Sequence, residues 1–378
     1  MDDLTVEYAL APAPGEDPEE KARGLALEQT AELPPTALPE GIDEVWTGRV
    51  EAVEPMGEGR YLARIAYRAD LAGGELPQLL NLLFGNISLK GGIRVVEVHW
   101  PPRLLESLGG PRHGIEGIRA MAGAPEGPLT CTALKPVGSS SVELARLAGE
   151  LAQGGMHVVK DDHGLVDQAP APFHERVQRC LAAVEEGGRA AGRSALYAPH
   201  VTGPRERMTE RLEAAGAAGC RAVLVSPWLV GLDALQWARD RFGLALLAHP
   251  ALTGAYFTDR HGVDAPVLLG HLFRAAGADA VIYPNVGGRF AFTEETCLRI
   301  NAHLREPLGD LRPALPTPAG GMRVTEAPGW VERYGDDVMV LIGGDLHREG
   351  DPRRAAARLR EALASRHQCT GHTRFDHA

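Results

Sequence analysis

Four polar residues that could bind a metal ion or move a proton stand together at Lys160, Asp161, Asp162 and His163. They directly follow the apolar run 156–159, which is typical of a buried strand. Charged side chains are seldom buried unless they are paired or bind a metal, so this cluster needs a partner from elsewhere in the fold. Lys160, Asp162 and His163 could belong to a Mg2+ site, because Mg2+ takes carboxylate oxygens and keeps several waters.

The same cluster also admits a purely structural interpretation. Successive side chains of a strand point to opposite faces, so Asp161 should lie on the other side from Lys160 and form a structural ion pair or a contact with a helix. An ammonium group offers only donors and a positive charge, so Lys160 must be neutralised, carbamylated by CO2 or kept as a countercharge. An ion-pair network explains the cluster as well as a metal site does.

Three further candidates end other apolar runs. Lys135 follows the run 129–134, and a lysine that is buried in a barrel mouth loses stability of its charged form, which suits it to acid–base catalysis. His200 and His249 stand in equivalent places. A single histidine in such a place is more often a polar cap than a catalyst.

Two glycine pairs follow the last two apolar runs, namely Gly320 with Gly321 and Gly343 with Gly344. Glycine lets the backbone approach an anion closely, and barrels often hold a phosphate after their last two strands. One pair alone would be equally well explained by an ordinary turn. Two pairs at the two expected places favour a phosphate site.

The elements that must position these residues repeat regularly after residue 128 as an apolar run, a polar turn and a helical pattern. Eight such units within about 250 residues predict a (β/α)8 TIM barrel, whose sites lie where the strands end. The expected strands cover residues 129–134, 156–159, 195–198, 222–225, 244–248, 280–283, 314–318 and 338–342. The expected helices cover 142–152, 173–186, 205–215, 232–241, 267–276, 294–304, a short stretch near Trp330, and 354–364. A doubly wound sheet is less well supported, because no GxGxxG turn follows a strand.

The first part of the chain, residues 1–125, predicts a smaller α+β domain of ferredoxin-like type. Its expected strands cover 5–10, 44–53, 59–67 and 93–99, and its expected helices cover 17–28, 77–84 and 112–122. A glycine- and proline-rich run begins at Gly123 and indicates the boundary. Residues 126–378 would then form the barrel, and the whole chain is of the α/β class.

Composition and charge exclude several classes of protein. The net charge of -11 argues against a nucleic-acid surface, although a local basic pocket for a small phosphate is compatible with it. No apolar run approaches the ~18 to 20 residues that span a bilayer, and the start of the chain is acidic where a signal peptide would be basic. We therefore expect a cytoplasmic protein without membrane contact. The 5 cysteines show no CxxC spacing, which indicates neither a disulfide framework nor a zinc site.

Nearly the whole chain resembles the RuBisCO superfamily, and within it the RuBisCO-like proteins (form IV) outside the methionine-salvage enolase group. The motifs that carry the resemblance are Leu134-Lys135-Pro136, Gly154-Gly155-Met156-His157-Val158-Val159-Lys160-Asp161-Asp162, Ala319-Gly320-Gly321 and Gly343-Gly344. The lysine–aspartate–aspartate motif after a glycine pair is highly specific.

The resemblance implies a metal site with one Mg2+ and a lysine carbamate. Lys160 is similar to the lysine that CO2 carbamylates, and Asp162 is similar to a Mg2+ ligand. His163 stands where the family usually has a glutamate ligand. Imidazole is a softer donor than carboxylate, so coordination should be weaker or completed by water. Lys135 is similar to the general acid/base of enolisation.

The resemblance also implies a homodimer with shared active sites. Glu28 and Asn86 are similar to residues that close the active site of a neighbouring subunit, and they are expected to act in catalysis. His249 is likewise expected to be catalytic, and His200 and Asn285 to contact the substrate.

The departures from the family decide which reaction is expected. The carboxylating enzymes carry a lysine in the loop after the sixth barrel strand, where this chain reads Tyr283-Pro284-Asn285-Val286-Gly287-Gly288-Arg289-Phe290. They carry a second lysine shortly after the first strand, where Val137 and Gly138 stand, and a serine where Ala319 stands. Without a lysine to stabilise the new carboxylate, CO2 fixation is not expected.

The remaining groups can bind one phosphate and move a proton next to a carbonyl. We therefore predict a Mg2+-dependent isomerase of a phosphorylated keto-sugar, of the 5-methylthioribulose 1-phosphate type, in sulfur salvage. The methionine-salvage enolases carry a lysine at the position of Asn86, which disfavours their reaction here. One alternative is a decarboxylase or transcarboxylase-hydrolase of a 3-oxo-isoapionate-type sugar acid phosphate. Another is a non-catalytic binding or regulatory protein.

Overall fold

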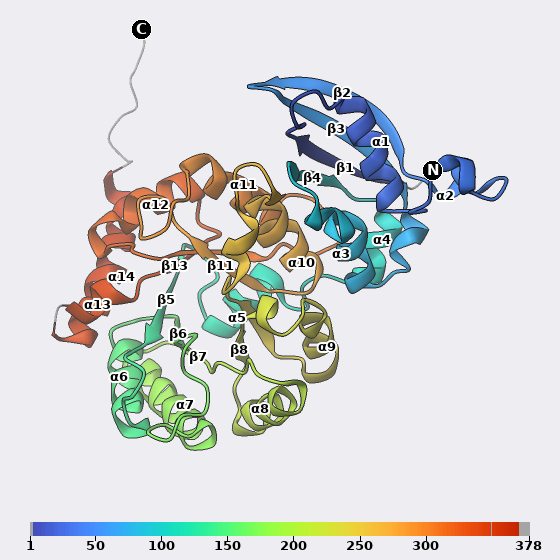
Figure 1. The fold of residues 1–378 in the computed structure, drawn as a ribbon. Coiled ribbons are helices and arrows are strands. Elements are labelled where there is room, and N and C mark those ends of the chain that lie inside the picture. The colour runs from blue at the N-terminus through green and yellow to red at the C-terminus, as the bar shows by residue number, and fades with distance from the viewer. Residues whose placement is uncertain (1–2, 349, 370–378) are drawn as a thin grey trace, which may run out of the picture.

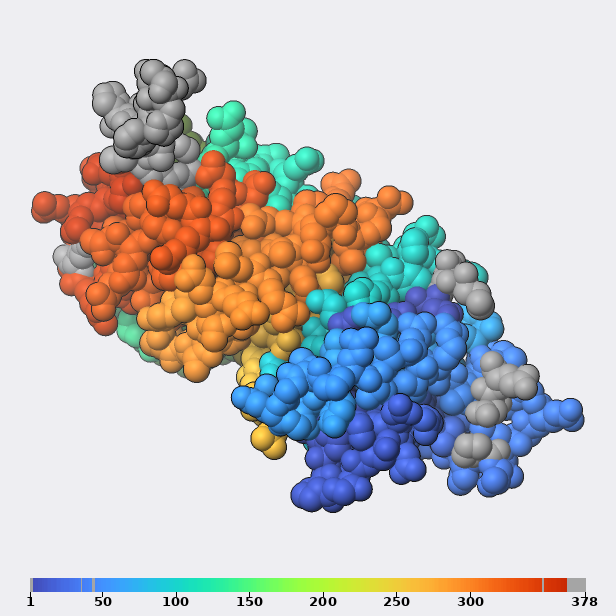
Figure 2. All heavy atoms as spheres, turned by 90° about the horizontal axis from the view of Figure 1, so that it is seen from above, coloured from blue at the N-terminus to red at the C-terminus, as the bar shows by residue number. Residues whose placement is uncertain are grey.

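The structure, a computed structural model, describes residues 3–348 and 350–369 and contains an open sheet and a barrel that lie side by side. The N-terminal residues gather at one end of the molecule in both views (Figures 1 and 2). In the part of the chain that the structure describes, no helix combines the length and the apolar character that a membrane crossing needs.

The N-terminal domain has the order strand, helix, strand, strand, helix, strand. Its main elements are β1 (Asp3–Leu10), α1 (Pro18–Glu28), β2 (Arg49–Gly57), β3 (Arg60–Arg68), α3 (Leu76–Phe84) and β4 (Ile93–His99). The antiparallel sheet has the order β4-β1-β3-β2. This is the ferredoxin-like arrangement, and it confirms the predicted fold class of this domain.

Alternation along β1 explains how the sheet meets its helices. Leu4, Val6, Tyr8 and Leu10 are fully buried, while the residues between them are partly exposed. One face of the sheet therefore packs against the core and the other faces outward. A two-residue turn at Glu58 and Gly59, both with positive φ, joins β2 to β3, as tight hairpins require.

The predicted strand at 44–53 is wrong at its start, because α2 (Ile42–Trp46) occupies those residues and β2 begins only at Arg49. The shorter elements of the domain are α4 (Pro102–Leu108) and the 3-10 turns η1 (Pro35–Ala37), η2 (Ala69–Ala72) and η3 (Asn86–Leu89).

Eight parallel strands form the barrel, and each lies within two residues of its predicted range. They are β5 (Leu129–Leu134), β6 (Val158–Asp161), β7 (Leu196–Ala198), β8 (Ala222–Val225), β9 (Ala245–Ala248), β11 (Ala280–Pro284), β12 (Leu315–Ala319) and β13 (Met339–Leu341). Two ladders, β13-β5-β6-β7 and β12-β11-β9-β8, make up the wall. A parallel bridge between His200 and Leu224 joins them on one side, and β12 contacts β13 on the other.

Helices cover the outside of the barrel (Figure 1). They are α6 (Ser141–Gln153), α7 (Phe173–Ala190), α8 (Arg205–Ala218), α9 (Asp233–Phe242), α10 (Phe273–Ala275), α11 (Glu294–Arg305), α12 (Ala327–Tyr334), α13 (Gly344–Arg348) and α14 (Pro352–Cys369), with short turns η4 (Pro227–Leu229), η5 (Thr253–Tyr256) and η7 (Val324–Glu326). The predicted helix 267–276 is present, but its first part, η6 (Pro266–Leu272), is a π-helix. Such π-segments are rare and often lie at functional sites.

One helix, α5 (Gly114–Ala122), closes the N-terminal end of the barrel. Its residues Ile115 and Ile118 pack with the apolar side chains inside the barrel. The buried carboxylate of Asp279 accepts from the backbone N–H groups of His113 and Gly114 at 2.6 and 2.8 Å. The opposite, C-terminal end stays available for a site.

A short strand that the sequence did not predict connects the two domains. β10 (Gly262–Val263) comes from a barrel loop, and it adds to the N-terminal sheet beside β4. Next to it, Asp264 forms ion pairs with Arg94 of β4 and, at 3.2 Å, with Arg299 of α11.

Candidate active site

The alternation of side chains along the barrel strands decides which candidate residues face inward. Cys131 of β5, Val158 of β6, Ala198 of β7 and Leu247 of β9 belong to the apolar cluster inside the barrel. Steps of two residues from these positions lead to the mouth at the C-terminal strand ends. The inward-facing polar residues there are Lys135, Lys160, Asp162, His200 and His249.

Lys160 is the buried amine of the site, with only 2% of its surface exposed. Its Nζ donates to the carbonyl oxygen of Asp161 at 3.0 Å. Burial lowers the pKa of this amine, and the charge of Lys135 acts in the same direction. Only the neutral form of an amine reacts with CO2, and a lower pKa increases the share of that form.

Asp161 faces away from the mouth and forms the structural ion pair that the sequence predicted. Its Oδ2 lies 3.1 Å from Nε of Arg176, and both side chains are fully buried. The carboxylate also accepts from the Tyr197 hydroxyl at 2.7 Å and from the His200 backbone N–H at 3.0 Å. These contacts fix β6 against β7 and α7, directly behind the site.

Asp162 joins Lys135 and His163 at the mouth. Its Oδ1 lies 2.9 Å from Lys135 Nζ and 3.6 Å from His163 Nδ1. Burial would raise the pKa of Asp162, but contacts with His163 and Lys135 hold it well below its usual range. The expectation that Lys135 is buried is wrong, because 38% of its side chain is exposed and its charge has a partner.

His249 is a neutral donor that stacks on His163. The two ring centroids are 4.3 Å apart and the ring planes differ by 13°. Burial holds the pKa of His249 well below its usual range. The backbone N–H of Ala251 donates to His249 Nδ1 at 3.2 Å, so the neutral ring carries its proton on Nε2.

His200 has the opposite tautomer. Its Nδ1 lies 2.9 Å from the carbonyl oxygen of Leu165, which can only accept, so Nδ1 carries the proton. Burial lowers the pKa of His200 to about 4, so the ring is neutral. Its Nε2 is therefore a buried acceptor, and it has no hydrogen-bond partner among residues 3–348 and 350–369. Such an unpaired group at a barrel mouth is a natural place for a substrate hydroxyl.

The two glycine-rich loops after β11 and β12 lie in direct contact with each other. Gly320 and Gly321 have φ values of +92° and +118°, which favour glycine. A Cβ at Gly288 would lie 2.2 Å from the Gly320 carbonyl oxygen, and the backbone N–H of Arg289 donates to that oxygen at 2.8 Å. The loops after β11 and β12 therefore meet backbone to backbone.

The second glycine pair lies next to Lys135. A Cβ on Gly343 would be 4.0 Å from Lys135 Cε, and Gly344 begins α13. The structure thus brings Gly343, one of the predicted phosphate glycines, next to the predicted acid/base lysine.

Asn285 does not join this group. Ala280 and Ile282 of β11 face the barrel interior, so the alternation turns Asn285 outward. Its Oδ1 accepts from the hydroxyl of Tyr334 on α12 at 2.6 Å, and its Nδ2 donates to the Val286 carbonyl at 3.3 Å. Both polar ends are thus engaged outside the mouth.

Glu28 and Asn86 lie together on the N-terminal domain. Asn86 Nδ2 donates to Glu28 Oε1 at 2.8 Å and to Glu32 Oε1 at 2.7 Å, and Lys90 forms an ion pair with Glu28. The hydrogen bonds from Lys90 and Asn86 lower the pKa of Glu28. Within the described ranges, no hydrogen bond or ion pair joins these four residues to the barrel mouth of the same chain. The sequence prediction missed Glu32 and Lys90, and helical spacing would not have found them, because α1 ends at Glu28 and Lys90 follows the 3-10 turn η3.

Lysine is scarce in this chain, which contains Lys21, Lys90, Lys135 and Lys160 among 39 basic residues. The other basic residues are arginines, which stay protonated in proteins. Three of the four lysines lie in the two polar groups described above: Lys135 and Lys160 at the barrel mouth, and Lys90 on the N-terminal domain.

Comparisons with known proteins establish the family. Residues 1–104 match the model of the ribulose bisphosphate carboxylase large chain, N-terminal domain, and residues 114–372 match that of its catalytic domain. The chain belongs to the RuBisCO large-chain family, which confirms the resemblance and the predicted fold class.

Within this family the chain is similar to RuBisCO-like proteins. It is 42% identical to ribulose bisphosphate carboxylase-like protein 1 of Rhodopseudomonas palustris, over 97% of this chain and 98% of that protein. A crystal structure of a Rubisco-like protein from Rhodopseudomonas palustris matches with a TM-score of 0.87 at 40% identity, covering 97% of this chain and 98% of that one. The 5-methylthioribulose-1-phosphate isomerase of Rhodospirillum rubrum is 40% identical over 87% of both chains.

Proposed function

We propose that this RuBisCO-like protein enolises a phosphorylated keto-sugar and isomerises a substrate of the 5-methylthioribulose 1-phosphate type. The observation that carries the proposal is the group of polar residues at one barrel mouth: the buried amine of Lys160, the Lys135–Asp162 ion pair, and two neutral histidines with opposite tautomers. The similarity to the Rhodospirillum rubrum isomerase supports the choice of substrate class.

One Mg2+ per site fits the donors that the mouth offers. Asp162, His163 and a carbamate on Lys160 would hold the ion, with water completing the coordination because imidazole is a softer donor than carboxylate. The anionic state of Asp162 and the buried amine of Lys160 suit this role. When bound, the ion would polarise the carbonyl oxygen of the substrate.

The proton is moved by groups of the chain itself. Lys135, when neutral, would take a proton from the carbon next to the carbonyl, and the electrons of that C–H bond would form the enediolate. As an ammonium, Lys135 would then return the proton to a different carbon. His249 Nε2–H would donate to the developing oxyanion, and His200 Nε2 would accept from a substrate hydroxyl.

The phosphate would be held by backbone N–H groups of the glycine loops after β12 and β13. The loop after β13 lies beside Lys135, which would place the phosphate end of the sugar near the acid/base group. Carboxylation is not part of the proposal, because the chain has no lysine after Lys160 and the loop after β11 is folded onto Gly320.

A homodimer would complete each site. The polar group of Glu28, Glu32, Asn86 and Lys90 lies on the N-terminal domain and has no bond to its own barrel mouth among the residues described. We propose that it faces the mouth of a second subunit, so that two sites are shared across the dimer.

Proton exchange tests this proposal directly. Purified protein with Mg2+ and bicarbonate in D2O should introduce deuterium at carbon in 5-methylthioribulose 1-phosphate and form its isomer, as followed by NMR. Lys135→Met should lose both activities, while Arg146→Met, which changes an exposed cation on α6, should keep them. Absence of both exchange and isomer in the wild-type protein would refute the proposal. Exchange or CO2 release with a 3-oxo sugar acid phosphate instead would indicate the decarboxylase alternative.

A further inference from the structure

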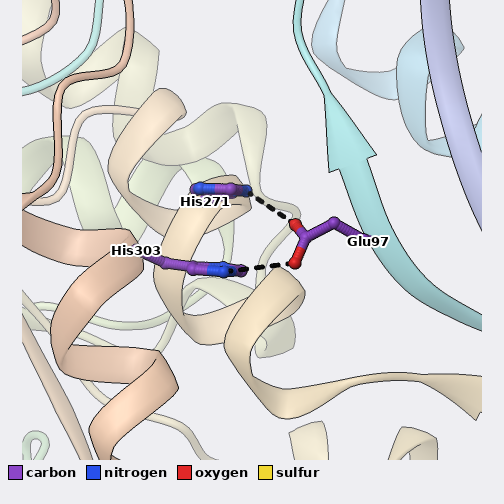
Figure 3. A group of neighbouring side chains, drawn as sticks. All are labelled: Glu97, His271 and His303. Carbon is purple, nitrogen blue, oxygen red and sulfur yellow. Dashed lines mark ion pairs between the residues drawn. The ribbon is translucent and has the colours of Figure 1, made fainter.

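A second group of possible metal ligands lies where the two domains meet (Figure 3). Glu97 comes from β4 of the N-terminal domain, His271 from the π-helix η6 and His303 from α11. One ligand atom from each residue lies within 4.8 Å of the others, and both histidines are buried. The imidazole rings stack in parallel with centroids 3.9 Å apart.

Hydrogen bonds fix the tautomers of both rings. His271 Nε2 lies 2.9 Å from Glu306 Oε1, and His303 Nδ1 lies 3.2 Å from the carbonyl oxygen of Pro266. Both partners can only accept, so each of these two nitrogens carries a proton. The other two ring nitrogens, His271 Nδ1 and His303 Nε2, both face the carboxylate of Glu97 (Figure 3).

The spacing of these ligand atoms would suit a cation bound between them. His303 Nε2 is 3.3 Å from Glu97 Oε2, and His271 Nδ1 is 3.7 Å from Glu97 Oε1. Both separations exceed a normal N–H···O bond. Two donors that each bind a tetrahedral ion at about 2.0–2.1 Å lie roughly 3.3–3.4 Å apart, which is close to these separations.

The surroundings match a metal centre in its outer contacts as well. Metal-binding histidines usually donate their other ring N–H to a carboxylate or a backbone carbonyl, as these two do with Glu306 and Pro266. Glu97 and Glu306 bring two negative charges, whereas Arg299, 3.3 Å from Glu97 Oε2, brings one positive charge. The Trp100 indole N–H donates to His271 Nδ1 at 3.2 Å, and an ion bound to this nitrogen would replace that hydrogen bond.

We propose that Glu97, His271 and His303 form a site for a borderline divalent transition metal of the Zn2+ type, which ties the N-terminal domain to the barrel. Two imidazoles and one carboxylate suit Zn2+ better than Mg2+, which prefers oxygen ligands. The ligands come from both domains, so the ion would act as a cross-link between them.

Metal titration tests the site. Chelator-treated protein should bind Zn2+ in calorimetry, and Co2+ in its place should show the visible absorption of a tetrahedral ion. Glu97→Gln and His303→Gln should abolish the signal of this site, and Glu306→Ala should weaken binding about 10- to 100-fold. Asp162→Asn should leave it unchanged, which separates this site from the barrel mouth and from the proposed catalysis.

Two controls keep the result decisive. His99→Gln changes a histidine that is 3.2 Å from Glu7 but has no second imidazole stacked on it in the part of the chain that the structure describes, and it should not affect binding. Circular dichroism should show that each variant is folded. Glu306→Ala tests the site separately, because it removes the carboxylate beside His271 Nε2 and leaves all three ligands in place. Absence of Zn2+ binding in the wild-type protein, or binding that survives both Glu97→Gln and His303→Gln, would overturn the proposal. The first of these results would assign the junction to a contact between His303 and Glu97 without a metal ion.

Discussion

Replacing Asp161 by asparagine should destabilise the protein strongly, although aspartate and asparagine side chains have nearly the same shape. The carboxylate and its partner Arg176 are both fully buried, 3.1 Å apart. Asparagine would leave the guanidinium charge in the interior without compensation, and breaking a buried pair in this way costs about 3–5 kcal/mol. Because a folded domain is stable by only about 5–15 kcal/mol, this is a large share of the total.

Urea unfolding followed by circular dichroism measures the effect as a shift of the midpoint. The matched control is Glu175→Gln, which removes an exposed ion pair with Arg179 on the same helix α7. Exposed pairs of this kind contribute about 0.3–0.5 kcal/mol, so the control should unfold close to the wild type. If Asp161→Asn unfolded at the same urea concentration as Glu175→Gln, the role given to the buried pair behind the site would be refuted.

Three further predictions concern pH, CO2 and assembly. Burial lowers the pKa of His157 from 6.5 to about 4, so between these pH values the unfolded chain binds a proton that the folded one does not. His157 alone should contribute about 3 kcal/mol to the loss of stability as pH drops through that window, and His157→Gln should remove that share in urea titrations. Lys160→Arg, which cannot be carbamylated, should lower turnover at least about 100-fold and abolish its dependence on bicarbonate; unchanged turnover would remove Lys160 from the mechanism. A mixture of Glu28→Ala and Lys135→Met subunits, each inactive alone, should regain about a quarter of wild-type activity if sites are shared; no recovery after subunit exchange would contradict sharing.

The barrel could be predicted closely because its strands are buried on both faces. Such strands appear as short continuous apolar runs, and eight of them with intervening helical patterns leave few alternatives. Elements that depend on contacts distant in the sequence were not predictable in the same way. β10 has two residues and exists because it pairs with β4. α2 replaces the start of the predicted strand 44–53, because residues 42–46 do not pair with the sheet.

The candidate site was predictable in position but not in detail. Polar residues at strand ends identified the mouth, and the inward or outward direction of a side chain follows from counting in steps of two. That count, applied to β11 from Ala280, would have placed Asn285 outside the mouth. The exposure of Lys135 and the tautomers of His200 and His249 depend on neighbours from other strands and loops, so the local sequence carries no signal for them.

The backbone contact between the loops after β11 and β12 has a kinetic consequence. Gly288 lies against Gly320 with no room for a side chain, and Arg289 donates to the Gly320 carbonyl, so neither loop can swing away alone without breaking this contact. In many enzymes the opening of such a loop limits the rate of product release. In this protein, opening the loop after β11 would also disturb the glycine turn that is proposed to hold the phosphate. Release of the phosphate end and opening of the mouth would then occur as one event with one rate.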